Sequence, residues 1–80
     1  MDEHYAVNIL KDTLDEKTEN LEKTTKAIAF IRGKINSPDI SFIDMKWLSN
    51  DLAVLENDRR ELRGQCSALR QAIAKLEREE

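Results

Sequence analysis

The stretch Ile35–Ser41, with the sequence INSPDIS, decides how this chain of 80 residues folds. It contains the only proline, Pro38, among Asn, Ser and Asp, which are residues typical of turns. Proline lacks a backbone N–H and its ring clashes with the preceding helical turn, so a regular helix is broken or kinked at this point. The sequence therefore predicts one segment before this stretch and another after it.

Both segments have the composition of long helices. Charged residues make up 36% of the chain, whereas aromatic residues make up 5% and there are only 2 glycines. Apolar residues also recur with the seven-residue repeat of packed helices. In the first segment the repeat runs through Val7, Leu10, Leu14, Leu21, Ile28 and Ile31. In the second it runs through Leu48, Leu52, Leu55, Leu62, Leu69, Ile73 and Leu76.

The two repeats fit each other in an antiparallel arrangement, in which facing residues have numbers with a constant sum. That sum is 76 for Val7 with Leu69, Leu14 with Leu62, Leu21 with Leu55, and Ile28 with Leu48. Half of 76 is 38, the number of the proline, so core pairing and the helix breaker agree on the centre of the turn. We call the interface formed by these apolar residues the seam. The same rule places Cys66 and Met45 in it, opposite Leu10 and Ile31.

The predicted fold is therefore all-α: a single domain, residues 1–80, forming an antiparallel, coiled-coil-like hairpin of two helices. We expect helix 1 at about residues 3–35, the turn at 36–40 and helix 2 at about 41–78. Ser41 and Asp44 have the spacing of a capping box, which predicts that helix 2 starts near Ser41, and Ser37 before Pro38 is a competing start.

Further apolar residues lie beside the seam, at heptad positions c and g, and share one edge of an antiparallel pair. We call this edge the apolar flank. It carries Ala6, Ile9, Ala27, Phe30, Trp47, Val54, Ala68 and Ala72, and Ile43, one turn before Trp47, extends it. From these we predict an interface formed by Ala27, Phe30, Ile43, Trp47 and Val54. Such a surface favours a homodimer in which two hairpins make a four-helix bundle. In the alternative interpretation, Trp47 and Phe30 fold over the turn as a local cap.

The opposite edge, which we call the charged flank, alternates basic and acidic side chains. It carries Lys11, Arg32, Lys46, Arg60, Arg63 and Arg70 together with Asp15, Glu22, Glu56 and Glu77. This pattern fits a solvated helix face or a docking site for an acidic partner. The rule of 76 also places Lys17 opposite Arg59 within the seam. We expect their side chains to extend outward, Arg59 toward Glu56, or the layer to set the register or accept an acidic side chain from a partner.

No pattern of catalytic, cofactor-binding or metal-binding residues stands out, so we expect a non-enzymatic protein without cofactors. Cys66 is the only cysteine and falls in the seam, where a small core residue is expected. Asp12, Asp15, Glu16 and Glu19 are helical neighbours without the glycine-turned loop of a calcium site, which indicates a solvated face. Gly64 lies in mid-helix, which suggests a bend or a close helix contact.

Several classes of partner are disfavoured. The net charge of −3 argues against nucleic acid, although a binder using Arg59, Arg60, Arg63 and Arg70 remains a minor alternative. A basic-zipper protein needs Arg and Lys before its first zipper leucine, but residues 37–47 contain two Asp and one Lys. No apolar run has the length of a membrane span, and the acidic start lacks signal-peptide features, so we expect no membrane association and a cytoplasmic location.

The stretch IDMKWLSNDLAVL resembles the second helix of the small aspartyl-phosphate phosphatases that act on sporulation response regulators. Their Ser-Gln-Glu-Leu-Asp motif corresponds here to Ser49, Asn50, Asp51, Leu52 and Ala53, which lacks the acidic residue after Leu. The outline of a hairpin turning through a proline also looks like the needle subunits of bacterial injection systems and their small chaperones. Our main expectation is a protein-binding module, an adaptor, chaperone or inhibitor with an unidentified protein partner. A phosphatase-like regulator acting through Asn50 or Asp51 is the alternative.

Overall fold

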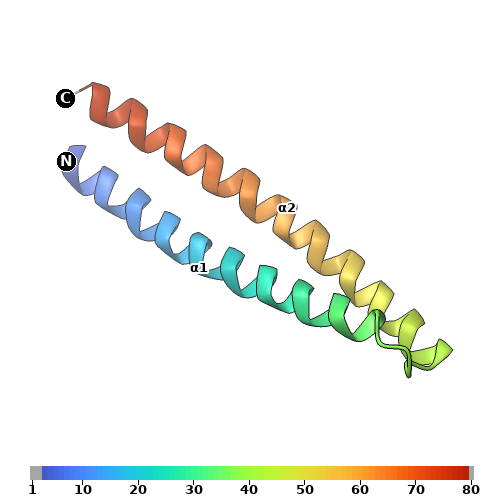
Figure 1. Cartoon of the computed structure of the whole chain (residues 1–80). Helices are drawn as coiled ribbons and strands as arrows, with labels where there is room; N and C mark the ends of the chain where they lie inside the picture. The colour runs from blue at the N-terminus through green and yellow to red at the C-terminus, as the bar shows by residue number, and fades with distance from the viewer. Residues whose placement is uncertain (1–2, 80) are drawn as a thin grey trace.

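The computed structural model describes the backbone of residues 3–79 and the side chains of residues 5–79. It contains two helices, α1 (Glu3–Ile35) and α2 (Phe42–Arg78), which pack against each other. Figure 1 shows that they run in opposite directions, so both ends of the chain lie at one end of a rod and the turn lies at the other. The rod measures 58 × 16 × 14 Å. The expected all-α hairpin is confirmed.

The turn is held by short-range hydrogen bonds. At the end of α1 the backbone N–H of Asn36 donates to the Arg32 carbonyl at 3.1 Å. Ser41 is the N-cap of α2, because its hydroxyl oxygen accepts the Asp44 N–H at 3.1 Å. The competing start at Ser37 is not used. The Ser37 hydroxyl accepts the Asp39 N–H at 3.4 Å, which closes a local turn around the proline instead of opening a helix.

The seam forms a narrow core along the rod. Among the side chains that the structure describes, four hydrophobic ones are buried, Val7, Ile28, Cys66 and Ile73, and Ile28 and Cys66 are almost completely inaccessible to solvent. The other predicted seam residues are half-buried: Leu10, Leu14, Leu21, Ile31, Leu48, Leu52, Leu55, Leu62, Leu69 and Leu76. Two helices meet along a single line, so each leucine keeps one side open to solvent.

The register of the two helices differs from the rule of 76, so that prediction is wrong. Lys11 pairs with Glu77 and Arg32 pairs with Glu56, whereas the rule would set the partners in each pair about 18 Å apart along the helix. Thr24 and Asp58, whose numbers add up to 82, line the same hollow, so the pairing is shifted by about one heptad.

Met45, the expected partner of Ile31, remains 39% exposed, and all residues from 41 to 47 are exposed. The first buried contact of α2 is therefore made at Leu48, which is half-buried. With the shifted register, the start of α2 extends past the end of α1 at Ile35, so no turn of α1 lies opposite Met45 (Figure 1). The prediction that Met45 is a seam residue is wrong for this reason.

The hairpin exposes more surface than a compact domain of its size. Its accessible surface is 6061 Å², whereas about 5,000 Å² is typical of a folded monomer of 9.3 kDa. Its radius of gyration is 17.9 Å, compared with about 12 Å for a compact chain of 80 residues. The excess surface means that much of the apolar content of the chain is not covered by the fold itself.

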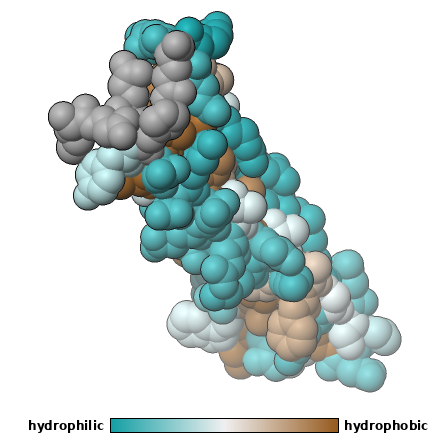
Figure 2. All heavy atoms as spheres, turned by 90° about the vertical axis from the view of Figure 1, so that its left-hand side faces the viewer, coloured by the Kyte–Doolittle hydropathy of each residue, from teal (hydrophilic) through white to brown (hydrophobic). Residues whose placement is uncertain are grey.

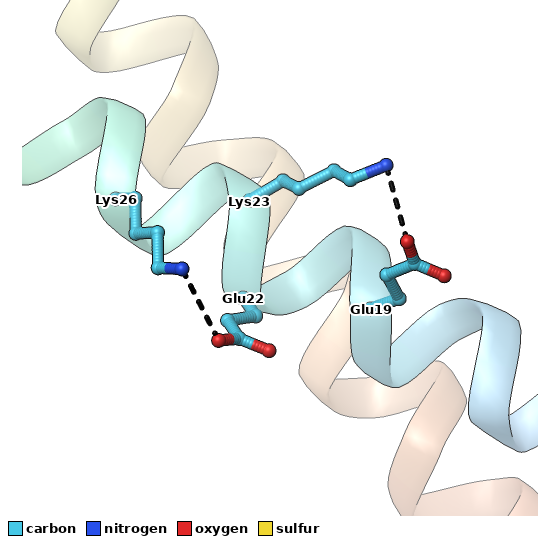
Figure 3. A network of polar contacts seen from close by, with 4 residues as sticks. All are labelled: Glu19, Glu22, Lys23 and Lys26. Atoms are coloured by element: carbon cyan, nitrogen blue, oxygen red, sulfur yellow. Dashed lines mark ion pairs between the residues drawn. The ribbon is translucent and has the colours of Figure 1, made fainter.

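The outward face of α1 is polar. Glu19 pairs with Lys23, and Glu22 pairs with Lys26, each at 3.3 Å. Figure 3 shows the four side chains along the outside of α1. In both pairs the acidic residue precedes the lysine by four positions, the orientation that stabilises a helix, by about 0.2–0.5 kcal/mol per pair.

Candidate interaction surface

The bulky residues of the apolar flank point into solvent. The exposed fractions are 64% for Trp47, 63% for Phe30 and 62% for Val54. Ile43 is also exposed, and Ala27 is half-buried at the foot of the flank. Phe30, Trp47 and Val54 occupy heptad position c, one step further from the seam than position g, where Ala27 is half-buried. The two helices do not cover these side chains, because the side chains point away from the seam.

The local-cap interpretation does not describe this geometry. A cap would bury Trp47 and Phe30 over the turn, but both keep almost two thirds of their surface exposed. The contact recorded for the Phe30 ring is with the Lys34 ammonium, 4.9 Å from the ring centroid. A cation over an aromatic ring is a weak and partly solvated contact at an exposed site. The aromatic side chains therefore remain available for contact with another molecule.

Two hollows lie between α1 and α2 on the apolar flank. The first, at the turn, has a volume of about 560 Å³ and is open to solvent. Its lining residues are Lys34, Ser37, Asp39, Ile40, Asp44, Trp47 and Leu48. Ile40, Trp47 and Leu48 supply its apolar part, and Lys34 of α1 and Asp44 of α2 line it beside them.

The second hollow lies midway along the rod and is polar. Its volume is about 300 Å³. It is lined by Lys17, Asn20, Thr24, Asp58, Glu61, Leu62 and Gln65. The apolar flank therefore has two apolar ends separated by a polar middle. The end view in Figure 2 likewise shows hydrophobic atoms at the near end and again toward the far end, with hydrophilic atoms between them.

Ion pairs connect α1 and α2 along the charged flank. Arg32 donates to a carboxylate oxygen of Glu56 at 2.7 Å, and Lys11 pairs with Glu77 at 3.7 Å. The expected pairing of Arg59 with Glu56 is not formed. Glu56 turns across the seam to the guanidinium of α1 instead, because that contact joins two edges already held together by the leucines.

Lys17 and Arg59 are both half-buried. Among the side chains of residues 5–79, neither forms an ion pair with a carboxylate. Lys17 lines the central hollow, together with Asp58 and Glu61. The layer that the rule of 76 predicts for these two residues is not formed, because the shifted register places Lys17 near Gln65 on α2.

The residues considered for chemistry have unremarkable surroundings. Cys66 has no exposed surface and lies in the core as a free thiol. Among the described residues, no group of His, Cys, Asp and Glu could hold a metal ion. A Cβ atom placed on Gly64 would meet nothing within 4 Å, so the expected close helix contact is absent from the hairpin. Asn50 and Asp51 are exposed on α2.

Phe42 is a feature that the heptad analysis missed. It is the first residue of α2 and is 82% exposed, the highest value among the large hydrophobic residues. Its position directly after the N-cap Ser41 was the available signal, because a residue in the first helical turn has no preceding turn to cover it. Phe42 extends the exposed apolar surface around the tip of the hairpin.

The described part of the chain contains no helix that is long and apolar enough to cross a membrane. No protein-family model matches the chain, and searches of curated proteins and of solved structures also return no match.

Proposed function

We propose that this protein is a non-enzymatic interaction module that self-associates through its apolar flank and uses the same kind of helical surface to bind another protein, as an adaptor, chaperone or inhibitor does. The observation that carries the proposal is the exposure of Trp47, Phe30 and Val54 on one edge of a rod whose own core is narrow. Large apolar side chains grouped on one face are typical of protein interfaces.

The energetics favour burial of this flank. Transfer of apolar surface out of water contributes about 25 cal/mol per Å², so covering one aromatic side chain contributes about 2 kcal/mol or more. Trp is also among the residues that most often dominate binding energy at interfaces. The excess surface of the hairpin, with 6061 Å² accessible to solvent, supports a partner that covers part of it.

Sedimentation equilibrium over a concentration series tests the proposal, with the fluorescence of Trp47 followed in parallel. We expect a dimer in which the emission of Trp47 shifts to the blue and acrylamide quenching falls as the concentration rises. Phe30→Ala keeps the fluorescent reporter and should weaken the dimer by at least about tenfold, because it removes about 2 kcal/mol of burial per interface side chain.

Arg63→Ala is the matched control, since it truncates an exposed side chain of the charged flank. It should leave the dissociation constant within about threefold of the original value, because isolated surface charges contribute little. A chain that stays monomeric at millimolar concentration, with Trp47 open to quencher throughout, would contradict self-association. Equal weakening by Phe30→Ala and Arg63→Ala would contradict the assignment to the apolar flank.

A further inference from the structure

The seven-residue repeat allows the two helices to face each other in more than one register. The ion pairs and the central hollow indicate a pairing sum of about 83, one heptad above 76. The burial of Ile73 agrees with this register. A sum of 83 places Ile73 opposite Leu10, whereas a sum of 76 places it opposite residue 3, before the first seam residue Val7. The structure therefore adopts one of two registers that the heptads allow.

Both registers cover the seam of α1. Each predicted seam residue of this helix faces an apolar residue of α2 at either sum, because the apolar positions of α2 repeat every seven residues. A slip from 83 to 76 would uncover Ile73 and Leu76 at the end of the rod where the termini lie. It would cover Met45 and part of Trp47 at the turn. Apolar area lost at one end is partly regained at the other, so hydrophobic burial favours the observed register only modestly.

The charged flank distinguishes the registers more sharply. In the observed register Lys11 pairs with Glu77 at 3.7 Å, and Arg32 pairs with Glu56 at 2.7 Å. A slip of seven residues would bring Arg70 to the place of Glu77 beside Lys11, and would separate Arg32 from Glu56. An attractive contact is then replaced by a repulsive one. Exposed ion pairs are individually weak, so a small change of charge is enough to alter the balance.

The middle of the seam acts in the same direction. A sum of 83 places Lys17 opposite Cys66 and Arg59 opposite Thr24, so each cation faces a small neutral side chain. A sum of 76 places the two cations on each other. Both are half-buried, where like charges repel more strongly than they do in water. The charge at residue 17 therefore helps to select the register.

We propose that the hairpin is a register switch, in which α2 slides along α1 by one heptad, about 10 Å, between pairing sums of 83 and 76. Lys17 and the charged flank hold it in the observed register. The turn permits the movement, because residues 36–41 span up to about 20 Å when extended and packed helices lie only about 8–10 Å apart. This inference goes beyond the proposed function and does not depend on self-association.

The switch controls the apolar surface at the tip of the hairpin. In the observed register residues 42–47 extend past Ile35, the end of α1 (Figure 1). After a slip, Met45 lies opposite Ile31, and Trp47 lies level with residue 29 of α1. A molecule that binds the extended tip stabilises the observed register, because it binds the slipped register less well.

Disulfide trapping with the native Cys66 tests the switch. Leu10→Cys brings a second thiol opposite Cys66 only after the slip, whereas Lys17→Cys does so in the observed register and serves as the reference. Thr24→Cys is the matched control, because Thr24 lies as far from Lys17 as Leu10 does and faces Cys66 in neither register. In a glutathione buffer, the equilibrium constant for the intramolecular disulfide should be at least about tenfold higher for Leu10→Cys than for Thr24→Cys. Equal constants would overturn the switch.

Reversal of the charge at residue 17 tests how the register is selected. In the slipped register Lys17→Glu faces Arg59, so K17E/L10C should form its disulfide at least about tenfold more favourably than L10C. K17E/T24C should match T24C. K17Q/L10C removes the repulsion without adding an attraction and should lie between L10C and K17E/L10C. An unchanged constant in K17E/L10C would overturn the switch.

The fluorescence of Trp47 gives a second readout of the same trapped forms. The disulfide of Leu10→Cys should reduce acrylamide quenching of Trp47 at least about twofold, relative to the disulfide of Lys17→Cys, because the slip draws Trp47 alongside α1. Equal quenching would overturn the proposed control of the tip. All measurements use dilute, monomeric protein with helicity verified by circular dichroism. A chain that never dimerises would contradict the proposed self-association and leave these results unaffected.

Discussion

The charged flank and the apolar flank run along opposite edges of the same hairpin, yet among the described residues only the charged flank carries ion pairs between the two helices. Arg32 reaches Glu56 and Lys11 reaches Glu77, each across the seam. On the apolar flank, Trp47 and Phe30 extend into solvent. The heptad geometry is common to both edges, so the difference arises from side-chain length and chemistry.

Long charged side chains can bend along a helix surface and meet above the seam while their ends remain hydrated. An aromatic side chain at position c is rigid and points away from the seam, so it cannot reach across to its counterpart. An edge built from such residues is covered only when another surface is placed on it. The comparison therefore separates contacts that the hairpin completes alone from contacts that need a partner.

Both flanks depend on the seam between them, so the largest effect is expected from its core. Ile28 is almost completely buried. Ile28→Ala should lower the free energy of unfolding by about 2–5 kcal/mol, through lost burial and the cavity that remains. Thermal unfolding followed by circular dichroism measures the change. Val54→Ala, on the exposed part of the apolar flank, is the control and should cost less than about 1 kcal/mol at concentrations where the chain is monomeric. Equal losses would mean that the flank belongs to the core of the hairpin.

A charge placed on the apolar flank should separate association from folding. Val54→Lys puts an ammonium into the proposed dimer interface, where removing a charge from water is costly, so the dimer should weaken by at least about 100-fold. Sedimentation equilibrium measures this change. Asn57→Lys adds the same charge at an exposed position outside both flanks and should leave association nearly unchanged. If helicity at low concentration falls in the first variant, Val54 supports the fold as well as the interface.

The antiparallel hairpin was predictable from the position of Pro38 and the two heptad repeats. The pairing sum of 76 was wrong, because a heptad seam fits almost as well after a shift of seven residues, and the ion pairs of Lys11 and Arg32 show that shift. Met45 was assigned wrongly because the same shift places it beyond Ile35, the last residue of α1. Glu56 was assigned wrongly because Arg59 and Arg32 compete for it, and only the three-dimensional spacing selects Arg32. The apolar flank was visible in the sequence, whereas the extent of its exposure required the structure.

Gly64 lies in α2, on neither flank, so a substitution there tests helix stability alone. Nothing lies within 4 Å of a Cβ atom built there, so Gly64→Ala should raise the free energy of unfolding by about 1 kcal/mol through helix propensity alone. A gain of this size corresponds to a rise in melting temperature of about 4–8 °C for a chain of this length. Gly33→Ala is the matched variant in α1, with equally open surroundings. Weaker association of the Gly64 variant would show that a second molecule approaches this face closely.

The smallest effect is expected on the charged flank itself. Arg32→Gln removes the 2.7 Å contact with Glu56, but both side chains are more than one third exposed, so the pair contributes less than about 1 kcal/mol. Glu56 is then free to pair with Arg59, one turn along α2, which returns part of the loss. The melting temperature should fall by only a few degrees in low salt, and the difference should vanish near 1 M NaCl, where the Debye length is about 3 Å. A loss above 2 kcal/mol that persists in high salt would mean that Arg32 fixes the alignment of the helices, and that the charged flank contributes to the fold as much as the seam does.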